Sequence, residues 1–372
     1  MGECVVGEEP ESQPSGPVPL RRGKQVVVGL LAEPDLPDMI ARHLVEVLPG
    51  ELAARVSRDV DWRVEIVDDP FAATAHDGPV IDKARLQSEG RPWEIALCLT
   101  DMPLEKPNGA VVAMISAADR VALISLPALG GIRLRRGTRD VAAAIVDELT
   151  VPPDDEDSKD PRSFRLIRRE TPPDGDVDVE MVMPVRGGRI RMLAGIVRAN
   201  RPWQLSLGLS TALAGAMAGS AFGILYSAIW MLATVLEPWR LAAITVAANG
   251  VLAVWLLAGH GLWEHRPYPR PVGWLINAAT VLTVVNGVAV FFLALFAFNL
   301  AAAALVIPAH HMATVLGHPV GVIDYLRISL MSSVLGTIAG AVGSGLEDDE
   351  TVRRAAYGTR RQIRRRIAQT DQ

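Results

Sequence analysis

The spacing of apolar residues divides the chain into two halves. Before residue 200, short apolar runs with strand-like and helix-like periods alternate, whereas long apolar stretches follow after it. The strand-like runs are residues 25–31, 62–67, 93–100, 110–115 and 121–126, and the helix-like runs are residues 35–49, 82–89 and 138–149. Because both kinds of run share one segment, we expect an α/β domain of three layers with a mixed sheet over residues 24–150.

Two pairs of runs predict β-hairpins. They are residues 110–115 with 121–126, which turn near 117–120, and residues 164–169 with 177–183. In the last run apolar residues alternate strictly with Asp178 and Glu180, which predicts a half-buried strand. Arg165, Arg168 and Arg169 are expected to pair with these acids across the strands, although the neighbour of this hairpin is left open.

Four apolar stretches are long enough to cross a bilayer, which takes about 20 residues. They are residues 205–233, 241–262, 275–307 and 328–346, and none has a charged residue in its middle. The composition agrees, with 49% hydrophobic and 21% charged residues and a mean hydropathy of +0.23. We therefore expect an all-α transmembrane bundle of four helices, in which the long first and third stretches tilt or extend beyond the lipid. Splitting the third stretch in two would move the C-terminus to the other side of the membrane.

The arginines set an expected orientation. Five lie in residues 185–201, seven in the C-terminal tail and two in the loop between the second and third stretches, whereas Arg240 and Arg327 are the only ones in the other two loops. By the positive-inside rule, both termini and the α/β domain are predicted to be cytoplasmic. The localisation expected is the inner (plasma) membrane, with several passes.

These boundaries give a full division of the chain. It runs as a disordered tail (1–23), the α/β domain (24–150), an acidic linker (151–162), a β-hairpin (163–184), a basic juxtamembrane helix (185–202), the transmembrane domain (203–346) and a charged cytoplasmic tail (347–372). The net charge of −5 argues against a nucleic-acid partner. Two cysteines make neither a disulfide framework nor a zinc cluster.

Carboxylates follow the predicted strands of the α/β domain. They are Glu33, Asp35, Asp68, Asp69 and Asp101. Since ligands gather at the carboxyl ends of strands, Asp68, Asp69 and Asp101 are candidate ligands for Mg²⁺, or for a cationic small molecule. The alternative, which we weigh more heavily, is that these acids cap helices and fill loops. Without a glycine-rich phosphate loop or a readable catalytic motif, no cofactor and no catalytic residue are predicted, and an enzyme is not favoured.

Small residues mark helix-packing faces in the apolar half. Gly215, Gly219 and Gly223 are spaced as GxxxGxxxG in the first stretch, and Gly336 and Gly340 as GxxxG in the fourth. Such ridges let helix backbones approach closely in lipid. They predict either packing within one bundle, which we favour, or a homo-oligomer interface.

Asparagines are the polar residues inside the apolar stretches. Asn249, Asn277, Asn286 and Asn299 are expected to face the bundle interior, where they either bond another helix or line a path. A transporter more often has an ionisable group at mid-depth, and the stretches hold none. Hydrogen bonding between helices is therefore favoured.

The basic segment before the first stretch has amphipathic spacing. It predicts a helix over residues 188–201 that lies on the bilayer, with Arg189, Arg191, Arg198 and Arg201 binding lipid head groups. A cytoplasmic extension of the first transmembrane helix is the alternative.

Three motifs carry a resemblance over residues 24–367. VRANRPW (197–203), LGHPVGVIDYLR (316–327) and GSGLEDDETVRRAAYGTR (343–360) are similar to a family of uncharacterised multi-pass membrane proteins of actinobacteria with an N-terminal cytoplasmic α/β domain. The resemblance implies this architecture and carries no activity with it.

Residues 97–129 also resemble the strand layout of archaemetzincin-type zinc peptidases. In those enzymes the next helix carries HExxHxxG, whereas residues 142–150 read AAAIVDELT here, with neither histidine. This likeness implies an ancestry in which the metal and the peptidase activity were lost.

The sequence therefore predicts a membrane-anchored cytoplasmic binding or scaffold module whose small ligand is not identified. A transporter or channel and a metal-dependent membrane enzyme are the alternatives. The expected partner is the lipid bilayer, and a second copy of the chain, bound through the small-residue helix faces, is the further possibility left open.

Overall fold

The computed structural model describes residues 18, 20, 22–71, 80–106, 109–150, 167–171, 177–200, 210–260, 262–263 and 270–344. These form two compact units, an α/β domain up to residue 188 without 130–132, and a helical unit of 130–132 and the residues from 189 onward. The predicted acidic linker and charged C-terminal tail lie outside the described residues, as does most of the predicted disordered tail. Within that tail Val18 is buried, and its N–H donates to Leu149 O.

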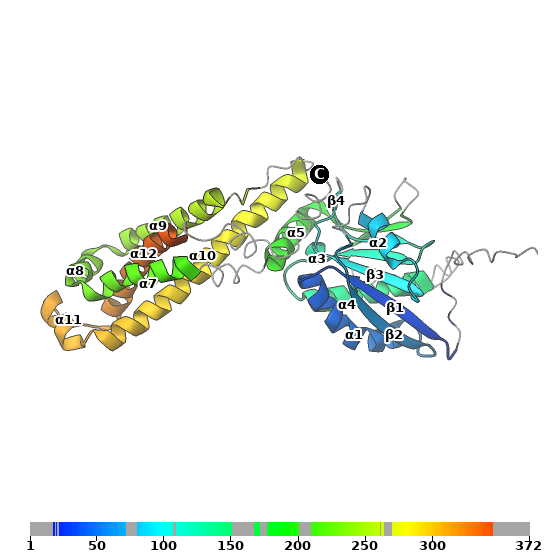
Figure 1. Ribbon diagram of the computed structural model, residues 1–372, viewed down its shortest axis with the longest axis horizontal. Helices are drawn as coiled ribbons and strands as arrows, with labels where there is room; N and C mark the ends of the chain where they lie inside the picture. Colours follow the sequence, from blue (N-terminus) through cyan, green and yellow to red (C-terminus); the bar gives the residue numbers. More distant parts are fainter. Residues whose placement is uncertain are drawn as a thin grey trace, which may run out of the picture. The chain divides into compact units, whose positions relative to one another are not determined.

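The elements follow one another largely as the periodicity predicts (Figure 1). The α/β domain contains β1 (Gln25–Ala32), α1 (Leu36–Arg55), β2 (Asp61–Asp68), α2 (Val80–Ser88), β3 (Ile95–Thr100), β4 (Glu105–Lys106), β5 (Gly109–Ser116), β6 (Val121–Ser125), α3 (Leu126–Leu129), α4 (Leu134–Thr150), β7 (Arg168–Glu170) and β8 (Val179–Pro184). After α5 (Val185–Ala199) come α7 (Ser210–Leu225), α8 (Ser227–Val235), α9 (Pro238–Gly259), α10 (Arg270–Val306), α11 (Ala309–Leu316) and α12 (Val322–Ser344).

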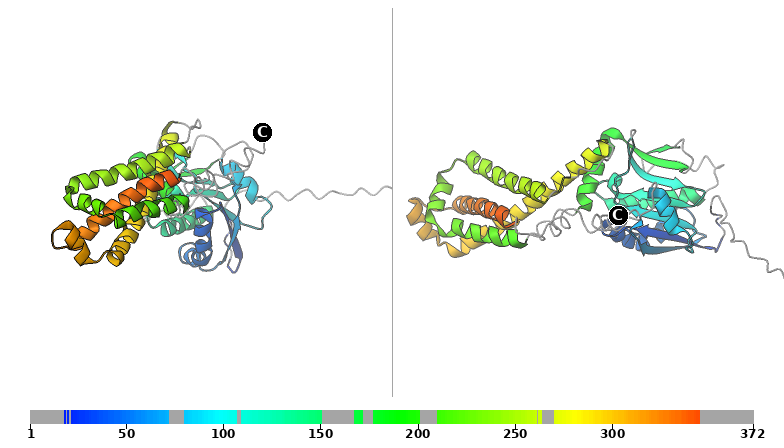
Figure 2. Two further views of the ribbon diagram at one scale, coloured as in Figure 1. Left: turned by 60° about the vertical axis from the view of Figure 1, so that its left-hand side comes forward. Right: turned by 45° about the horizontal axis from the view of Figure 1, so that its top comes forward.

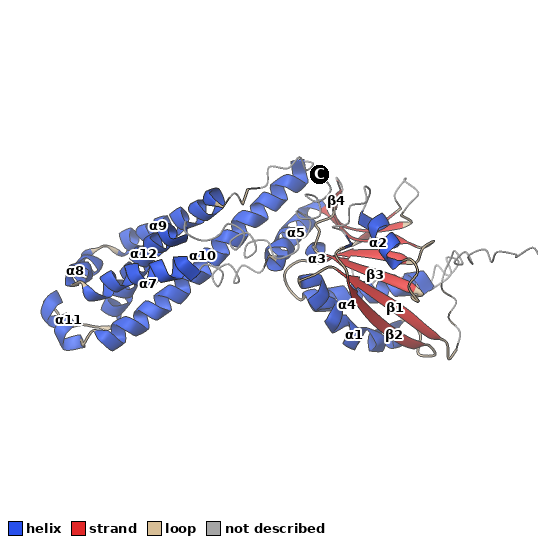
Figure 3. Ribbon diagram, viewed as in Figure 1, coloured by secondary structure: helices blue, strands red, loops and turns tan. Residues whose placement is uncertain are grey.

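One mixed sheet, drawn in red in Figure 3, runs through the α/β domain. Its strand order is β2-β1-β3-β6-β5-β8-β7, with β4 paired to β5. The first four strands are parallel, and the others join antiparallel. The predicted mixed sheet and both hairpins are confirmed. The open question of the second hairpin is answered, because β8 pairs with β5 and extends the same sheet.

Helices cover both faces of the sheet. Ile81 and Ala84 of α2 share a buried cluster with Leu31 of β1, Cys98 of β3 and Leu123 of β6. Because successive side chains of a strand point to opposite faces, the residues between these positions face the other layer. In that layer α1 and α4 pack against each other and against the strands.

Two expectations about the α/β domain were wrong. Helix α1 does not end near Pro49 but continues to Arg55. Proline removes one helical hydrogen bond, and burial of the apolar side chains on either side of it, Leu48 and Leu52, offsets that loss. Strand β8 is not half-buried, because Glu180 is buried like its apolar neighbours.

The partners of the β8 acids also differ from the expectation. Lys106 of β4 binds Glu180 at 2.6 Å, whereas Arg169 pairs with Glu148 of α4 and not with an acid across the strand. Arg165 lies outside the described residues.

The helical unit holds helices that are long and apolar enough to cross a membrane (Figure 2). Among the residues that the structure describes, three helices pass by length and composition, namely Pro238–Gly259, Gly273–Val306 and Val322–Gly343. The first predicted span is not one straight helix, since α7 and α8 meet at Tyr226 with a bend of 83°. Counting this pair as one span gives four. The third stretch is a single helix and is not split in two.

The glycine ridges of the first and last spans face each other within one chain. A Cβ on Gly219 would lie 2.5 Å from Ala339 Cβ, and a Cβ on Gly340 would lie 3.0 Å from Ala212 O. A Cβ on Gly215, Gly223 or Gly336 would likewise meet the opposite helix. The favoured prediction of packing within one bundle therefore accounts for these five glycines.

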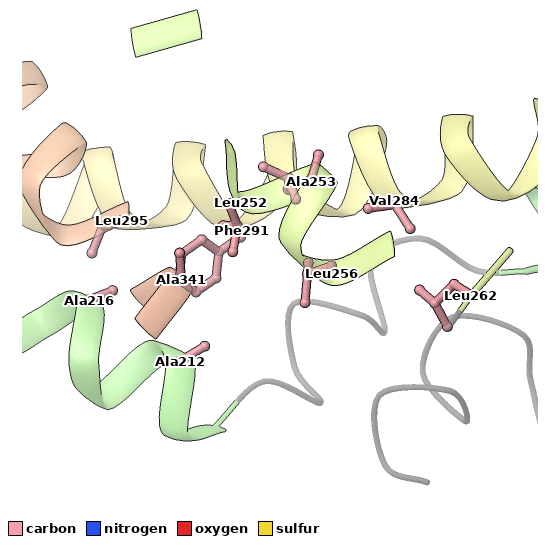
Figure 4. Close-up of a cluster of buried hydrophobic side chains, with 11 residues drawn as sticks. Ala212, Ala216, Leu252, Ala253, Leu256, Leu262, Val284, Phe291, Leu295 and Ala341 are labelled. Carbon is pink, nitrogen blue, oxygen red and sulfur yellow. The ribbon is translucent and has the colours of Figure 1, made fainter. Parts of the chain in front are cut away.

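Large apolar side chains close the remaining space of the bundle. Phe291 of α10 lies in a buried cluster with Ala212 and Ala216 of α7, Leu252 of α9 and Ala341 of α12 (Figure 4). Small residues on α7 and α12 thus leave room for an aromatic ring from α10.

Candidate functional site

Four neighbouring parallel strands end in polar residues on the same face of the sheet. In the sheet register, residues Asp69, Glu33, Thr100 and Ser125 follow, by two positions, the buried side chains Val67, Leu31, Cys98 and Leu123 that face α2. Since side chains two apart in a strand share a face, these four line up along the carboxyl edge on the α2 side. We call Asp69, Glu33, Thr100 and Ser125 the polar row.

The centre of the polar row is completely buried. Glu33, Thr100 and Ser125 are each 0% exposed. Thr100 Oγ1 donates to Glu33 Oε2 at 2.5 Å and accepts from Met102 N at 3.0 Å. Ser125 Oγ donates to Met102 O at 2.6 Å, so the turn after β3 is tied to the row by both hydroxyl groups. These bonds fix the position of the Glu33 carboxylate in a protein interior, where a charged group needs such partners.

The row lies where the chain changes direction. From β1 the chain passes through α1 on one face to β2, and then through α2 on the other face to β3 on the opposite side of β1. The carboxyl ends of β1 and β3 therefore form a topological switch point, the usual ligand-binding position in open α/β sheets. Glu33 and Thr100 meet at that point.

One end of the row carries opposite charges. Asp69 Oδ2 lies 4.0 Å from Arg91 Nη2. Burial raises the pKa of the Asp69 carboxyl, the Arg91 guanidinium lowers it, and the nearby Glu33 raises it again. Asp69 is thus a half-buried carboxylate that lies near both the negative charge of Glu33 and the positive charge of Arg91.

Arg91 is itself held by an aromatic platform. Its guanidinium carbon lies 5.0 Å from the centroid of the Trp93 ring. The indole N–H of Trp93 donates to Glu65 Oε2 at 3.3 Å, and the ring covers Gly29 of β1, where a Cβ would collide with it. A glycine is needed at this position because the ring lies directly on the backbone of the strand.

Cys98 precedes Thr100 by two residues in β3, so it lies on the same face of the sheet, and it is fully buried. Burial raises the pKa of its thiol strongly, and the charge of Asp69 adds to the effect. The thiol stays protonated at neutral pH and behaves as a small apolar group.

Asp68 lies on the other face of β2 from Asp69. Burial raises the pKa of the Asp68 carboxyl, and its charged neighbours are Asp38 and Arg42 of α1 together with Asp69 and Asp35. Adjacent residues in a strand point to opposite faces, so the predicted trio of Asp68, Asp69 and Asp101 is divided. Among the residues that the structure describes, no group of three or more His, Cys, Asp or Glu side chains is placed to hold a metal ion.

The loop from β1 to α1 has a strained backbone. Asp35 has a φ of 73°, a left-handed value that a residue with a side chain rarely adopts. Its C=O accepts from Met39 N, and Glu33 O accepts from Asp38 N, so the first turn of α1 holds this conformation. Strain of this kind gathers at ligand-binding positions.

Sequence reasoning found only part of this site. Glu33 and Asp69 were recognised as acids that follow strands, whereas Thr100, Ser125 and the Arg91–Trp93 pair were missed. The missing signal was the strand register, because only the alignment of Leu31 with Cys98 places Glu33 beside Thr100.

The predicted basic helix forms as α5. Arg191 and Arg198 are exposed, whereas Met192 and Ile196 on its apolar side are buried. Protein therefore covers much of the side that was expected to face lipid. Binding of lipid head groups by the arginines stays a prediction. Arg201 lies outside the described residues.

No protein-family model, no curated protein and no solved structure matches this chain. The functional argument therefore rests on the geometry of its own residues.

Proposed function

We propose that the protein is a membrane-anchored binding module. Its α/β domain takes a small ligand at the polar row, and its helices hold the domain at the bilayer. The observation that carries the proposal is the buried Glu33–Thr100 pair at the switch point of the sheet. A carboxylate kept inside a protein by dedicated hydrogen bonds is costly, and such groups cluster at functional sites.

The chemistry of the row favours a ligand with a positive charge or several hydrogen-bond donors. Glu33 and Asp69 are acceptors, and the hydroxyl groups of Thr100 and Ser125 accept as well as donate. The first turn after β1 lacks the glycines of a phosphate loop, which speaks against a nucleotide held by its phosphates. We infer an amine, a divalent cation or a polyhydroxyl compound.

The test uses the full chain in detergent and follows the melting temperature. The probes are MgCl₂, spermidine and adenosine, which represent a cation, a polyamine and a hydroxyl-rich ligand. The proposal predicts that one probe stabilises the protein and that Glu33→Gln abolishes the shift. If none of the three probes raises the melting temperature of the wild-type protein, the proposal is contradicted.

The orientation is part of the same proposal. We infer that both termini and the α/β domain lie on the cytoplasmic side of the inner membrane, and the asymmetric distribution of the arginines supports this orientation. Fusing alkaline phosphatase, which is active only outside the cytoplasm, to residue 372 tests it. An inactive fusion supports the orientation, and an active one contradicts it.

A transporter or channel is the second candidate. The observation in its favour is the 83° break at Tyr226, since broken helices line substrate sites in many transporters. A metal-dependent enzyme has less support, because Asp68 and Asp69 face opposite sides of the sheet. Contact between copies of the chain would need a surface other than the glycine ridges, which pack internally.

A further inference from the structure

A group of neutral polar side chains is buried where α7, α10 and α12 meet. It consists of Ser220 of α7, Asn299 of α10, and Ser329, Ser332 and Ser333 of α12, and we call it the polar seam. All five residues are at most 1% exposed. In a bilayer-spanning bundle such groups find no solvent, so each needs a partner inside the protein.

The side-chain amide of Asn299 connects the three helices through its nitrogen, whereas its oxygen makes no such contact among the described residues. Its Nδ2 donates to Ser220 Oγ at 3.1 Å and to Ser333 Oγ at 2.9 Å. Its Oδ1 is buried and has no hydrogen-bond partner among the described residues. Exchanging the oxygen and the nitrogen would not change this imbalance, because both hydroxyl groups stand at the same end of the amide.

Ser329 shows a second imbalance. The hydroxyls of Ser332 and Ser333 donate to the carbonyl one turn back, to Ile328 O and Ser329 O respectively. This is the usual way in which a serine is satisfied in a membrane helix. The Ser329 hydroxyl is just as deeply buried, yet within the described part of the chain it has no such bond.

The broken helix brings a third feature to the seam. Helix α7 ends at Leu225, five residues after Ser220, which is about 7.5 Å along a helix. In that last turn Phe222 O accepts from Tyr226 N, and Ile224 O accepts from Trp230 Nε1. Gly223 lies directly against Ser332. The last turn of α7, where the helix dipole is negative, therefore lies beside Ser332 of the seam.

We propose that the polar seam binds a monovalent alkali cation. Buried amide and hydroxyl oxygens beside the carbonyl end of a discontinuous helix are the ligands that such ions take inside membrane proteins. A divalent ion would need carboxylates, and the five side chains of the seam are all neutral. The proposal concerns the helical unit and does not depend on the polar row.

The experiment measures the melting temperature of the full chain in detergent. Chlorides of Na⁺, K⁺, Li⁺ and N-methylglucamine are compared at equal ionic strength, so that general salt effects cancel. Ion binding to the native state predicts that one alkali cation raises the midpoint by about 3 °C over N-methylglucamine. Equal midpoints in all four salts would contradict the proposal and leave a bound water as the partner of these groups.

Variants locate the effect. Ser329→Ala and Asn299→Ala should abolish the cation-dependent rise. If Asn299→Ala does not fold, Ser329→Ala alone is sufficient, because it removes a single hydroxyl group that has no hydrogen-bond partner among the described residues. Asn286→Ala is the matched control, since Asn286 is exposed on the same helix and its side chain donates to Leu282 O in its own turn. A cation-dependent rise that persists in Ser329→Ala, or disappears in Asn286→Ala, would overturn the assignment.

Discussion

Glu33 and Thr100 come from sequence positions 67 residues apart and share a hydrogen bond of 2.5 Å in the interior of the α/β domain. Both side chains are 0% exposed. The bond links the ends of β1 and β3, two adjacent parallel strands. The chain adds β2 on one side of β1 and then crosses to the other side to add β3, so these two strand ends form the topological switch point of the sheet. It fixes an acidic group where an open sheet accepts ligands.

Removing the donor of this bond tests how strongly Glu33 depends on it. Thr100→Val keeps the shape of the side chain but leaves a buried carboxylate with one partner fewer. We expect the free energy of unfolding to fall by about 1–3 kcal/mol, measured by urea denaturation of the full chain. Thr138→Val is the control, because that hydroxyl donates to Leu134 O one turn back in its own helix, and its loss should cost less than about 1 kcal/mol.

Asp69 makes stability depend on pH. Its pKa is raised in the folded protein, mainly by burial, so the native state binds more protons than the unfolded state between the unfolded and folded pKa values. Stability therefore falls as the pH rises through this window, and the full penalty is present at neutral pH. Asp69→Asn should raise the melting temperature at pH 7, and this advantage should shrink as the pH falls towards about 4. A difference that is the same at both pH values would refute the explanation.

Lys106 and Glu180 form an ion pair whose acid is only 3% exposed. Lys106→Met leaves that carboxylate without its countercharge, and we expect a loss of about 1–3 kcal/mol in the free energy of unfolding. The double variant Lys106→Met/Glu180→Met should recover most of the loss, because no buried charge remains. If the double variant is no more stable than the single one, the pair is not what stabilises the β4 edge.

Gly219 tests the packing of the first and last spans. A Cβ there would lie 2.5 Å from Ala339 Cβ, so Gly219→Ala must push the helices apart. We expect the free energy of unfolding to fall by about 1–3 kcal/mol, measured in detergent. Gly250→Ala on α9 is the control, since nothing lies within 4 Å of its added Cβ and the better helix former should stabilise slightly.

The α/β domain could be predicted well from the sequence because its strands carry strong local signals. Short apolar runs placed β1, β2 and β3, and the short turn after β5 predicted a hairpin. The pairing of β8 with β5 could not be predicted, because their contacts span about 70 residues and carry no local pattern. Glu180 was wrongly predicted to lie on the solvent-exposed face for a related reason. Its partner Lys106 belongs to a strand of only two residues, which has no recognisable sequence pattern.

The helical unit shows a different limit. Apolar length placed α9, α10 and α12, yet the break at Tyr226 lies within an unbroken apolar stretch and has no proline to mark it. Tertiary contacts hold it instead. Trp230 Nε1 donates to Ile224 O, and Arg327 Nη1 donates to Thr234 O at the end of α8. Such contacts are invisible to a hydropathy profile.

Neighbouring carboxylates on opposite faces of β2 allow the most direct test of the central claim. Asp69 belongs to the polar row and Asp68 does not, although the two differ by one position and both have raised pKa values. The measurement is calorimetric titration of full-length wild type, Asp69→Asn and Asp68→Asn with whichever of MgCl₂, spermidine or adenosine stabilises the wild type. The account predicts that Asp69→Asn weakens binding at least about tenfold, a loss of 1.4 kcal/mol, while Asp68→Asn binds like the wild type. Equal affinities for all three proteins, or a loss confined to Asp68→Asn, would contradict it.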